Sequence, residues 1–260
     1  MAKQPKKAPE KAAVENFTAE NPVSLSTLLA AKPKFSHFKV WLVGDTALIT
    51  HAWSEKAKRE MLGKQGKAPS GGKEERNPHA DYIASLYEMG DGVYGFPVTG
   101  IKKCILSRAH KDKGTARTDV RSSLWLDAQM VRVRPALAGA ICDMPLVRIW
   151  GGDPEMREDM VKVGAGLNKT ANLAYRGQFT HWAIRISGRY NPVVVNAATL
   201  SALIFEAGMA CGLGEWRIER DGVFGTFHAA DPDEEAAWED FSAGRRKDVP
   251  VVDPYLMAAE

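Results

Sequence analysis

Alternation of apolar and polar positions predicts strands in the second half of the chain. Residues 130–134 alternate strictly, and residues 146–150 and 179–186 form two further apolar runs. Two strands, or one long strand, are expected over 38–43 and 47–53 around a Gly44-Asp45 turn, and a last strand over 223–228. A period of two is typical of a strand with one face in the core, so these segments predict a half-buried sheet.

Helical spacing of apolar residues marks two longer segments. Residues 98–109 place Ile101, Cys104 and Ile105 on one face, and residues 196–209 carry an apolar stripe behind Asn196, a good capping residue. Shorter helices are expected over 54–62 and 81–89, with an aromatic turn over 94–97. The order of the strong elements is β-α-β-β-α-β, which is that of ferredoxin-like and RNA-recognition domains. The predicted fold class is therefore α+β, a ferredoxin-like antiparallel sheet with helices and long inserts.

The chain divides into three regions by composition. Residues 1–33 are rich in Lys, Ala and Pro and lack the apolar stretch of a secretory signal, so a disordered N-terminal tail is predicted. Residues 34–228 are expected to form the ferredoxin-like domain, with a glycine-rich basic insert over 63–78. Residues 229–260 are predicted to be an acidic C-terminal extension.

Composition excludes several classes of protein. With 45% hydrophobic and 26% charged residues, the 260-residue chain is neither collagen-like nor mostly disordered. No apolar run approaches the roughly 18–20 residues that a spanning helix needs, so no membrane partner is expected. The three cysteines lie far apart, which indicates neither a disulfide framework nor a metal knuckle. We therefore expect a cytoplasmic protein without a cofactor or metal.

Charge is unevenly distributed although the net charge is only +3. Seven Lys or Arg residues fall between positions 101 and 121, and nine acidic residues fall between 229 and 260. A basic middle and an acidic end can hold an anionic partner at one place and repel it at another, or can both be solvated faces. Lys102, Lys103 and Arg108 lie on the polar side of the helix expected at 98–109, so their side chains should point to solvent or to an anion.

The predicted sheet offers a second basic surface. Alternation over 179–186 sends Trp182 to the core and puts His181 and Arg185 on the other face. Arg132 and Arg134 share one face of the strand at 130–134, and Arg176 flanks these strands. Cations beside flat rings suit single-stranded nucleic acid, although a solvated sheet face explains them equally well.

A glycine-rich segment follows the second long helix. Gly212, Gly214, Gly222 and Gly225 surround the last expected strand. Glycine permits positive φ and close approach of backbone amides to phosphate, but a helix C-cap followed by a hairpin turn explains the same residues. The segment is neither a dinucleotide fingerprint, whose order of elements is the reverse, nor a P-loop. Within it, Arg217 and Arg220 are phosphate candidates, and Trp216 is a stacking platform or, as we favour, a plug for the core.

Gly212-Leu213-Gly214 and Gly222-Val223-Phe224-Gly225 after a helix resemble the glycine-rich loop of the RAMP superfamily. These are ferredoxin-like RNA-binding proteins related to the backbone subunits of CRISPR complexes. Residues 94–102, a Pro-containing turn before a basic helix, extend the resemblance, and the chain is also similar to proteins encoded by bacteriophages and prophages. It departs from the CRISPR subunits at residues 214–217 and in the basic insert before Pro78. The resemblance implies the fold more directly than the biological role.

The expected function is non-catalytic binding of single-stranded nucleic acid, with RNA favoured over DNA. The resemblance implies several copies along a strand, as a homo-oligomer or as a subunit of a ribonucleoprotein. One alternative is a phage-encoded inhibitor or scaffold that mimics a RAMP subunit, with the acids of 231–240 imitating phosphate. A second is a metal-independent ribonuclease that uses His51 or His110 as acid or base. No nucleophile elbow or metal-ligand spacing is present, so an enzyme is not expected.

Overall fold

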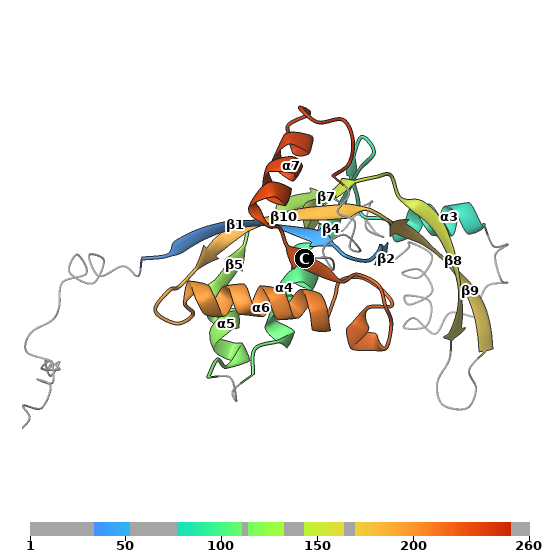
Figure 1. Ribbon diagram of the computed structural model, residues 1–260. Helices are drawn as coiled ribbons and strands as arrows, with labels where there is room; N and C mark the ends of the chain where they lie inside the picture. Colours follow the sequence, from blue (N-terminus) through green and yellow to red (C-terminus); the bar gives the residue numbers. More distant parts are fainter. Residues whose placement is uncertain (1–33, 53–76, 111–113, 133–142, 164–169, 251–260) are drawn as a thin grey trace, which may run out of the picture. The chain divides into compact units, whose positions relative to one another are not determined.

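The computed structural model describes residues 34–52, 77–110, 114–132, 143–163 and 170–250 (Figure 1). Residues 1–34 and 35–260 are separate units, and the elements below belong to the second. They form an α+β structure of mostly antiparallel sheets with five α-helices in the described ranges. The predicted tail, the predicted helix over 54–62, most of the basic insert and Arg134 lie outside the described residues.

The central sheet is antiparallel throughout. Its neighbouring strands, in order, are β11 (Phe227–Ala229), β1 (Ser36–Gly44), β10 (Trp182–Tyr190), β7 (Asp143–Gly151), β4 (Val93–Pro97) and β3 (Glu88–Gly90). Two short strands complete it, β5 (Leu124–Leu126) beside β10 and β6 (Gln129–Arg132) beside β7. Strands from both ends of the chain therefore meet at β1, which pairs with β10 over eight residue pairs.

A second, smaller sheet contains β2 (Leu48–Thr50), β9 (Thr170–Phe179) and β8 (Glu155–Val163). Strands β8 and β9 form a long hairpin between β7 and β10 in sequence. Helix α3 (Pro78–Ser85) packs against β9, where the Ser85 hydroxyl accepts a hydrogen bond from the Gly177 amide at 2.8 Å. The hairpin is thus fixed at its base by β2 and α3.

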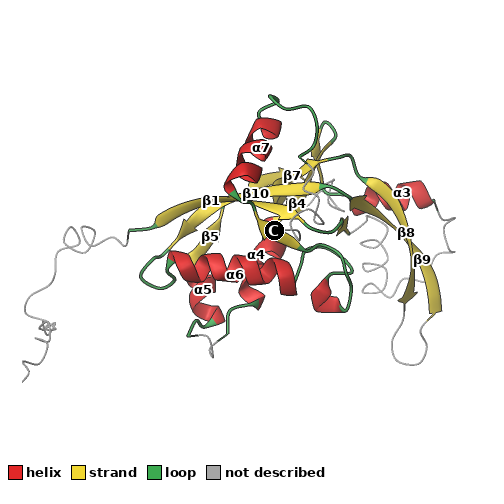
Figure 2. Ribbon diagram, in the orientation of Figure 1, coloured by secondary structure: helices red, strands yellow, loops and turns green. Residues whose placement is uncertain are grey.

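One face of the central sheet is covered by helices (Figure 2). Helices α4 (Val98–Ser107) and α6 (Ala197–Ala210) pack on each other, and α5 (Arg117–Ser123) lies beside α4. The predicted helices are confirmed here: Ile101, Ile105 and Leu203 are buried with Trp182 in the main hydrophobic core. Asn196 caps α6, accepting a hydrogen bond from the Thr199 amide at 2.8 Å. None of the described helices is both long and apolar enough to cross a bilayer.

The opposite face carries α7 (Pro232–Ser242), which lies across β1 and β10 in Figure 1. Trp238 is buried and stacks on Trp41 at a centroid distance of 5.9 Å, in a second hydrophobic cluster with Val43 and Ala183. The region predicted as an acidic extension therefore supplies part of the core. Its predicted boundary, between residues 228 and 229, falls inside β11.

The prediction of one strand over 179–186 is wrong, because β9 ends at Phe179 and β10 begins at Trp182. Both residues belong to the same buried cluster, although they are three positions apart. A single strand with a period of two cannot bury both on one face, so a turn at Thr180 and His181 separates two strands.

Other boundaries also differ from the prediction. The expected turn at 94–97 is strand β4, because β7 supplies hydrogen-bonding partners for it. Helix α3 begins at Pro78 rather than Asp81, since the Asn77 side chain caps it, and it ends at Ser85 rather than Met89, which lies in β3. The last strand is restricted to Phe227–Ala229, because the residues before it pair with other parts of the glycine-rich segment.

Candidate functional site

Residues 211–225, called here the glycine loop, fold back on themselves through backbone hydrogen bonds. The Leu213 amide donates to the Gly225 carbonyl at 2.8 Å, and the Phe224 amide donates to the Trp216 carbonyl at 3.0 Å. Gly225 has φ +71°, and a Cβ there would lie 1.8 Å from the Leu213 oxygen. The glycines are therefore required by the fold of the loop itself, which agrees with the interpretation of a helix C-cap followed by a turn. The Leu213 and Phe224 amides are already hydrogen-bonded within the loop, so they cannot bind a phosphate.

Strand β2 anchors the glycine loop from outside. The Glu215 amide donates to the Ile49 carbonyl at 3.0 Å, and the Gly225 amide donates to the Ala47 carbonyl at 2.9 Å. Gly214 has φ +78°, and a Cβ there would lie 2.3 Å from the Ile49 oxygen. Because its backbone is held at both ends, the loop presents its side chains in a defined arrangement.

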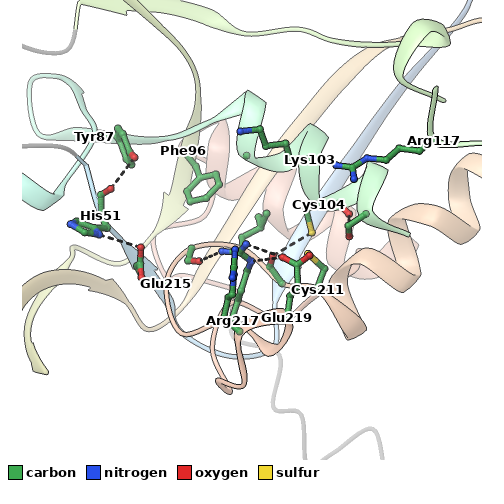
Figure 3. Close-up of a pocket in the computed structure, with 16 residues that line it drawn as sticks. His51, Tyr87, Phe96, Lys103, Cys104, Arg117, Cys211, Glu215, Arg217 and Glu219 are labelled. Atoms are coloured by element: carbon green, nitrogen blue, oxygen red, sulfur yellow. Dashed lines mark hydrogen bonds and ion pairs between the residues drawn. The ribbon is translucent and has the colours of Figure 1, made fainter. Parts of the chain in front are cut away.

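A pocket of about 490 Å³ lies between α4 and the glycine loop (Figure 3). Lys103 and Cys104 reach it from α4, Arg117 reaches it from the start of α5, and Arg217 and Arg220 reach it from the loop. Five of the residues predicted from the sequence line this one pocket: Lys103, Gly212, Gly214, Arg217 and Arg220. Segments more than a hundred residues apart in the chain therefore meet at a single site.

The pocket carries spare positive charge. Both of its carboxylates have partners within the chain: Glu219 binds the Arg217 guanidinium through Nε at 3.1 Å and Nη2 at 2.8 Å, and Glu215 is hydrogen-bonded to His51 at 3.1 Å. These hydrogen bonds hold the pKa of each glutamate below its usual value, so both stay ionised. The remaining cations, Lys103, Arg117 and Arg220, are exposed and have no ion-pair partner among the described residues.

Flat rings also line the pocket. Tyr87, Phe96 and His51 contribute to its wall, and the Tyr87 hydroxyl donates to the His51 carbonyl at 3.1 Å. Trp216 does not plug the core, which corrects the interpretation that we favoured from the sequence. It is 39% exposed and has φ +52°, on the surface of the glycine loop. The left-handed backbone at this position turns its side chain outward.

The three basic residues of α4 have different surroundings. The Lys102 ammonium donates to the carbonyls of Leu124 at 2.5 Å and Arg121 at 3.1 Å, and burial, together with the charge of Arg121, lowers its pKa. Arg108 pairs with Glu206 of α6 at 3.7 Å. The expectation that all three point to solvent or to an anion therefore fails for Lys102, Arg108 meets an acid of its own chain, and Lys103 alone lines the pocket.

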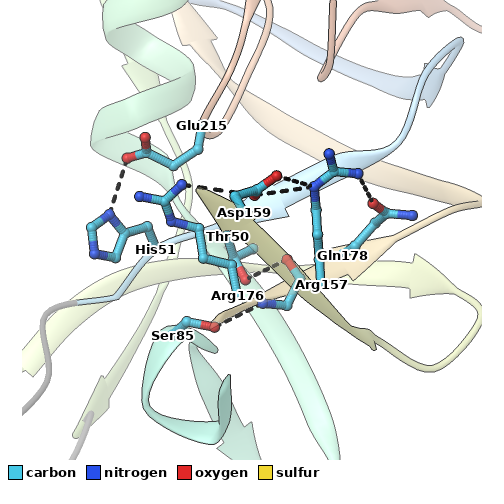
Figure 4. A network of polar contacts seen from close by, with 9 residues as sticks. Thr50, His51, Ser85, Arg157, Asp159, Arg176, Gln178 and Glu215 are labelled. Carbon is cyan, nitrogen blue, oxygen red and sulfur yellow. Dashed lines mark hydrogen bonds and ion pairs between the residues drawn. The ribbon is translucent and has the colours of Figure 1, made fainter. Parts of the chain in front are cut away.

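Arg176 belongs to a buried polar network at the base of the hairpin (Figure 4). Only 9% of the residue is exposed, and its Nη1 lies 4.0 Å from the Asp159 carboxylate. Asp159 also binds the Arg157 guanidinium, which stacks 4.6 Å from the Phe224 ring centre in the glycine loop. The structure therefore places Arg176 inside the molecule, where it supports the loop rather than presenting its charge on the surface.

The cations predicted to share one sheet face do not all lie on one side: Arg185 lies on the side of α7, whereas Arg132 is opposite Asp143, on the face of β7 that carries Ile149. Arg185 and Lys39 both pair with Glu239 of that helix, at 3.2 and 2.8 Å, and Arg132 pairs with Asp143 at 3.1 Å. His181 lies in the turn between β9 and β10, apart from these pairs. Arg185, Lys39 and Arg132 thus have acidic partners within the chain, whereas Arg148 lies over the Trp150 ring and Arg189 lies over the rings of Phe35 and Trp125.

The histidines weighed as catalysts have distinct positions. His51 lines the pocket and is oriented by Glu215, whereas His110 is exposed beyond the end of α4 and does not line it. His228 bridges Asp45 at 2.6 Å and Glu234 at 2.9 Å, and these hydrogen bonds raise its pKa to about 9. Within the described ranges, no group of three or more His, Cys, Asp or Glu side chains could hold a metal ion.

Arg117, Tyr87 and Phe96 are among the pocket residues that sequence reasoning missed. Arg117 belongs to the basic run over 101–121, but nothing in its spacing separates it from the other cations there. The two rings lie on different segments from the glycine loop, so only tertiary contacts bring them to it.

No protein-family model, curated protein or solved structure matches this chain. The pocket between α4 and the glycine loop is therefore interpreted from its own geometry.

Proposed function

We propose that this protein binds single-stranded nucleic acid, with a backbone phosphate in the pocket between α4 and the glycine loop. The observation that supports this most is the meeting of Lys103, Arg117 and Arg220, from three elements, without an acidic partner for any of them among the described residues. Phosphate oxygens are the anions that such exposed cations bind in nucleic acids. The partly exposed ring of Tyr87 beside them offers a stacking face for a base, whereas Phe96 is buried in the core.

The strand order supports a ferredoxin-like core for this function. The order β-α-β-β-α-β along the chain is that of β1, α4, β7, β10, α6 and β11. In the sheet they lie as β11-β1-β10-β7, so that each helix connects two strands with a third between them. On this proposal the hairpin of β8 and β9 is an insert, and membership of the RAMP superfamily would imply that RNA is preferred to DNA.

A salt series of binding to labelled single-stranded RNA, single-stranded DNA and duplex tests the proposal. Each phosphate contact contributes a slope of about −0.7 in log affinity against log salt for single strands. The combined variant Lys103→Ala, Arg117→Ala, Arg220→Ala should therefore weaken binding to all sequences alike and flatten the slope by about 2. Stoichiometry on strands of increasing length measures whether several copies align on one strand.

A matched control removes the same charge from positions outside the pocket. The combined variant Arg132→Ala, Arg185→Ala, Arg245→Ala lowers the net charge equally, but these residues pair with acids of the chain. It should keep the slope of the unaltered protein. Equal loss in both variants would show that binding follows net charge alone, and no binding to any strand would refute the function.

The pair His51 and Glu215 supports a second candidate, metal-independent cleavage of RNA. The imidazole is held by a carboxylate beside the cationic pocket, which is the arrangement of an oriented general base. Incubation of labelled RNA with a chelator present separates the two functions. Cleavage that is abolished by His51→Ala but not by His110→Ala would establish a ribonuclease. RNA that stays intact when the protein is saturated with it would show that the protein binds RNA without cutting it.

A further inference from the structure

Two cysteine thiols lie together at the inner wall of the pocket. Cys104 comes from the middle of α4, and Cys211 is the C-cap residue of α6; both are free and buried, and both line the pocket. The Cys104 thiol donates to the carbonyls of Gly212 at 3.3 Å and Ala207 at 3.5 Å. Because these carbonyls belong to the backbone on either side of Cys211, the Cys104 sulfur is held against that residue (Figure 3).

The groups around the two sulfurs make them unequal. Hydrogen bonding from Cys104 is the largest effect that lowers the pKa of Cys211 to about 7; burial opposes it, and Ser107 and Arg217 add to the lowering. Glu219 raises the pKa of Cys211, but its carboxylate is bound by Arg217. The pKa of Cys104 is raised by the same hydrogen bond and by burial. One thiol is therefore about half ionised at neutral pH while its neighbour is protonated, which suits an attacking and a resolving cysteine.

We propose that Cys104 and Cys211 are a redox modification site, at which a small peroxide that enters the pocket oxidises the pair to a reversible disulfide. The Cys211 thiolate attacks one peroxide oxygen, the O–O bond breaks, and hydroxide leaves and takes up a proton to become water. The resulting Cys211 sulfenic acid is then attacked by the Cys104 sulfur, which loses its proton as the S–S bond forms and a second water leaves. Two thiols lose two electrons and two protons, and one hydrogen peroxide becomes two waters.

The disulfide would join α4 directly to the first residue of the glycine loop. Gly212 and Leu213, which line the pocket, directly follow Cys211, and Lys103 directly precedes Cys104. The bond therefore joins two walls of the pocket, and it removes the thiolate charge from beside Arg217. A dithiol reductant attacks the bond by thiol exchange and restores both thiols.

Peptide mapping of the unaltered full chain after hydrogen peroxide treatment in native buffer tests the proposal. Remaining thiols are alkylated, and the protein is cut with trypsin. We expect a disulfide-linked pair of the peptides 104–108 and 190–217, a mass loss of two hydrogen atoms from the whole chain, and reversal by dithiothreitol. The peroxide dose is one that links or oxidises both cysteines when the protein is unfolded in urea. If both Cys104 and Cys211 are still alkylated as free thiols in the folded protein at that dose, the proposal is overturned. A pair that joins either residue to Cys142 or to a second chain would also overturn it.

Single variants separate the two roles. In Cys104→Ser, Cys211 should stop at the sulfenic acid and be labelled by dimedone, because the resolving thiol is absent. In Cys211→Ser, Cys104 should stay reduced at the same dose. Equal dimedone labelling of both variants would contradict the assigned roles. The mapping of the unaltered chain decides the main proposal even where a variant does not fold.

Discussion

The two sides of the central sheet carry similar cations in opposite surroundings. On the side of α7, Lys39 and Arg185 share Glu239, and Trp238 closes the cluster between helix and sheet. On the side of α4 and α6, Lys103, Arg117 and Arg220 surround a pocket whose two glutamates are already paired. The comparison separates cations that an acid of the same chain pairs from cations with no ion-pair partner among the described residues, and it is the pocket cations of the second kind that we propose to meet a ligand.

The largest effect is expected where α7 meets the sheet. Trp238→Ala removes a side chain that is 1% exposed, and such a truncation costs about 3–5 kcal/mol in the free energy of unfolding. Trp216→Ala on the glycine loop is the matched control and should change stability by less than about 0.5 kcal/mol. Urea unfolding of both variants measures the difference. Similar losses would mean that α7 contributes no more to the core than an exposed loop side chain.

A smaller effect is expected at His228, which links the turn before β2 to α7 through Asp45 and Glu234. His228→Gln should cost about 1.5–3 kcal/mol at neutral pH, because hydrogen bonds between charged groups are lost. Since folding raises the pKa of this histidine from 6.5 to about 9, its contribution is complete below 6.5 and is lost as the pH rises through 9. Stability curves of the protein and the variant should therefore converge above pH 9. A constant gap across that range would contradict the assignment.

The two neighbouring lysines of α4 allow a cation that supports the fold to be compared with a cation that lines the pocket. Lys102→Met should lower the free energy of unfolding by about 1 kcal/mol, because its ammonium satisfies the Leu124 and Arg121 carbonyls at the end of α5. Lys103→Met keeps the same aliphatic stem and should leave stability nearly unchanged while it weakens nucleic-acid binding. Thermal unfolding and strand binding are measured on both. Exchange of the two phenotypes would assign the phosphate contact to Lys102.

The smallest expected change is a shift in the reactivity of Cys211. Its alkylation rate by iodoacetamide should rise with pH through a midpoint near 7, since the thiolate is the reactive form. Cys104→Ser should move that midpoint upward, because Cys104 supplies the largest lowering contribution. Alkylation of the folded protein, quenched at set times and followed by mass analysis of the peptides, gives both midpoints. If the midpoint is unchanged in Cys104→Ser, groups other than Cys104 are responsible for the lowered pKa of Cys211.

Local pattern was sufficient for the elements with strong periodicity. The apolar spacing of Ile101 to Ile105, the cap at Asn196 and the burial of Trp182 are all present in the structure. These features depend on neighbours within a few residues, and such neighbours are visible in the sequence. The break between β9 and β10 was missed because a turn without Gly or Pro has no local marker, although burial of both Phe179 and Trp182 requires it.

The amino-acid sequence by itself determined which residues carry charge, where the main helices lie and that the loop after α6 needs its glycines. Only the tertiary structure decided which cations keep a free charge. Lys102 and Lys103 are adjacent in the chain, yet one satisfies the end of α5 and the other lines the pocket. Arg185 forms an ion pair with Glu239, 54 residues further along the chain, so its charge is not free. The physical reason is that an ion pair or a satisfied carbonyl depends on distances between segments, which packing of the whole chain sets and spacing along it does not.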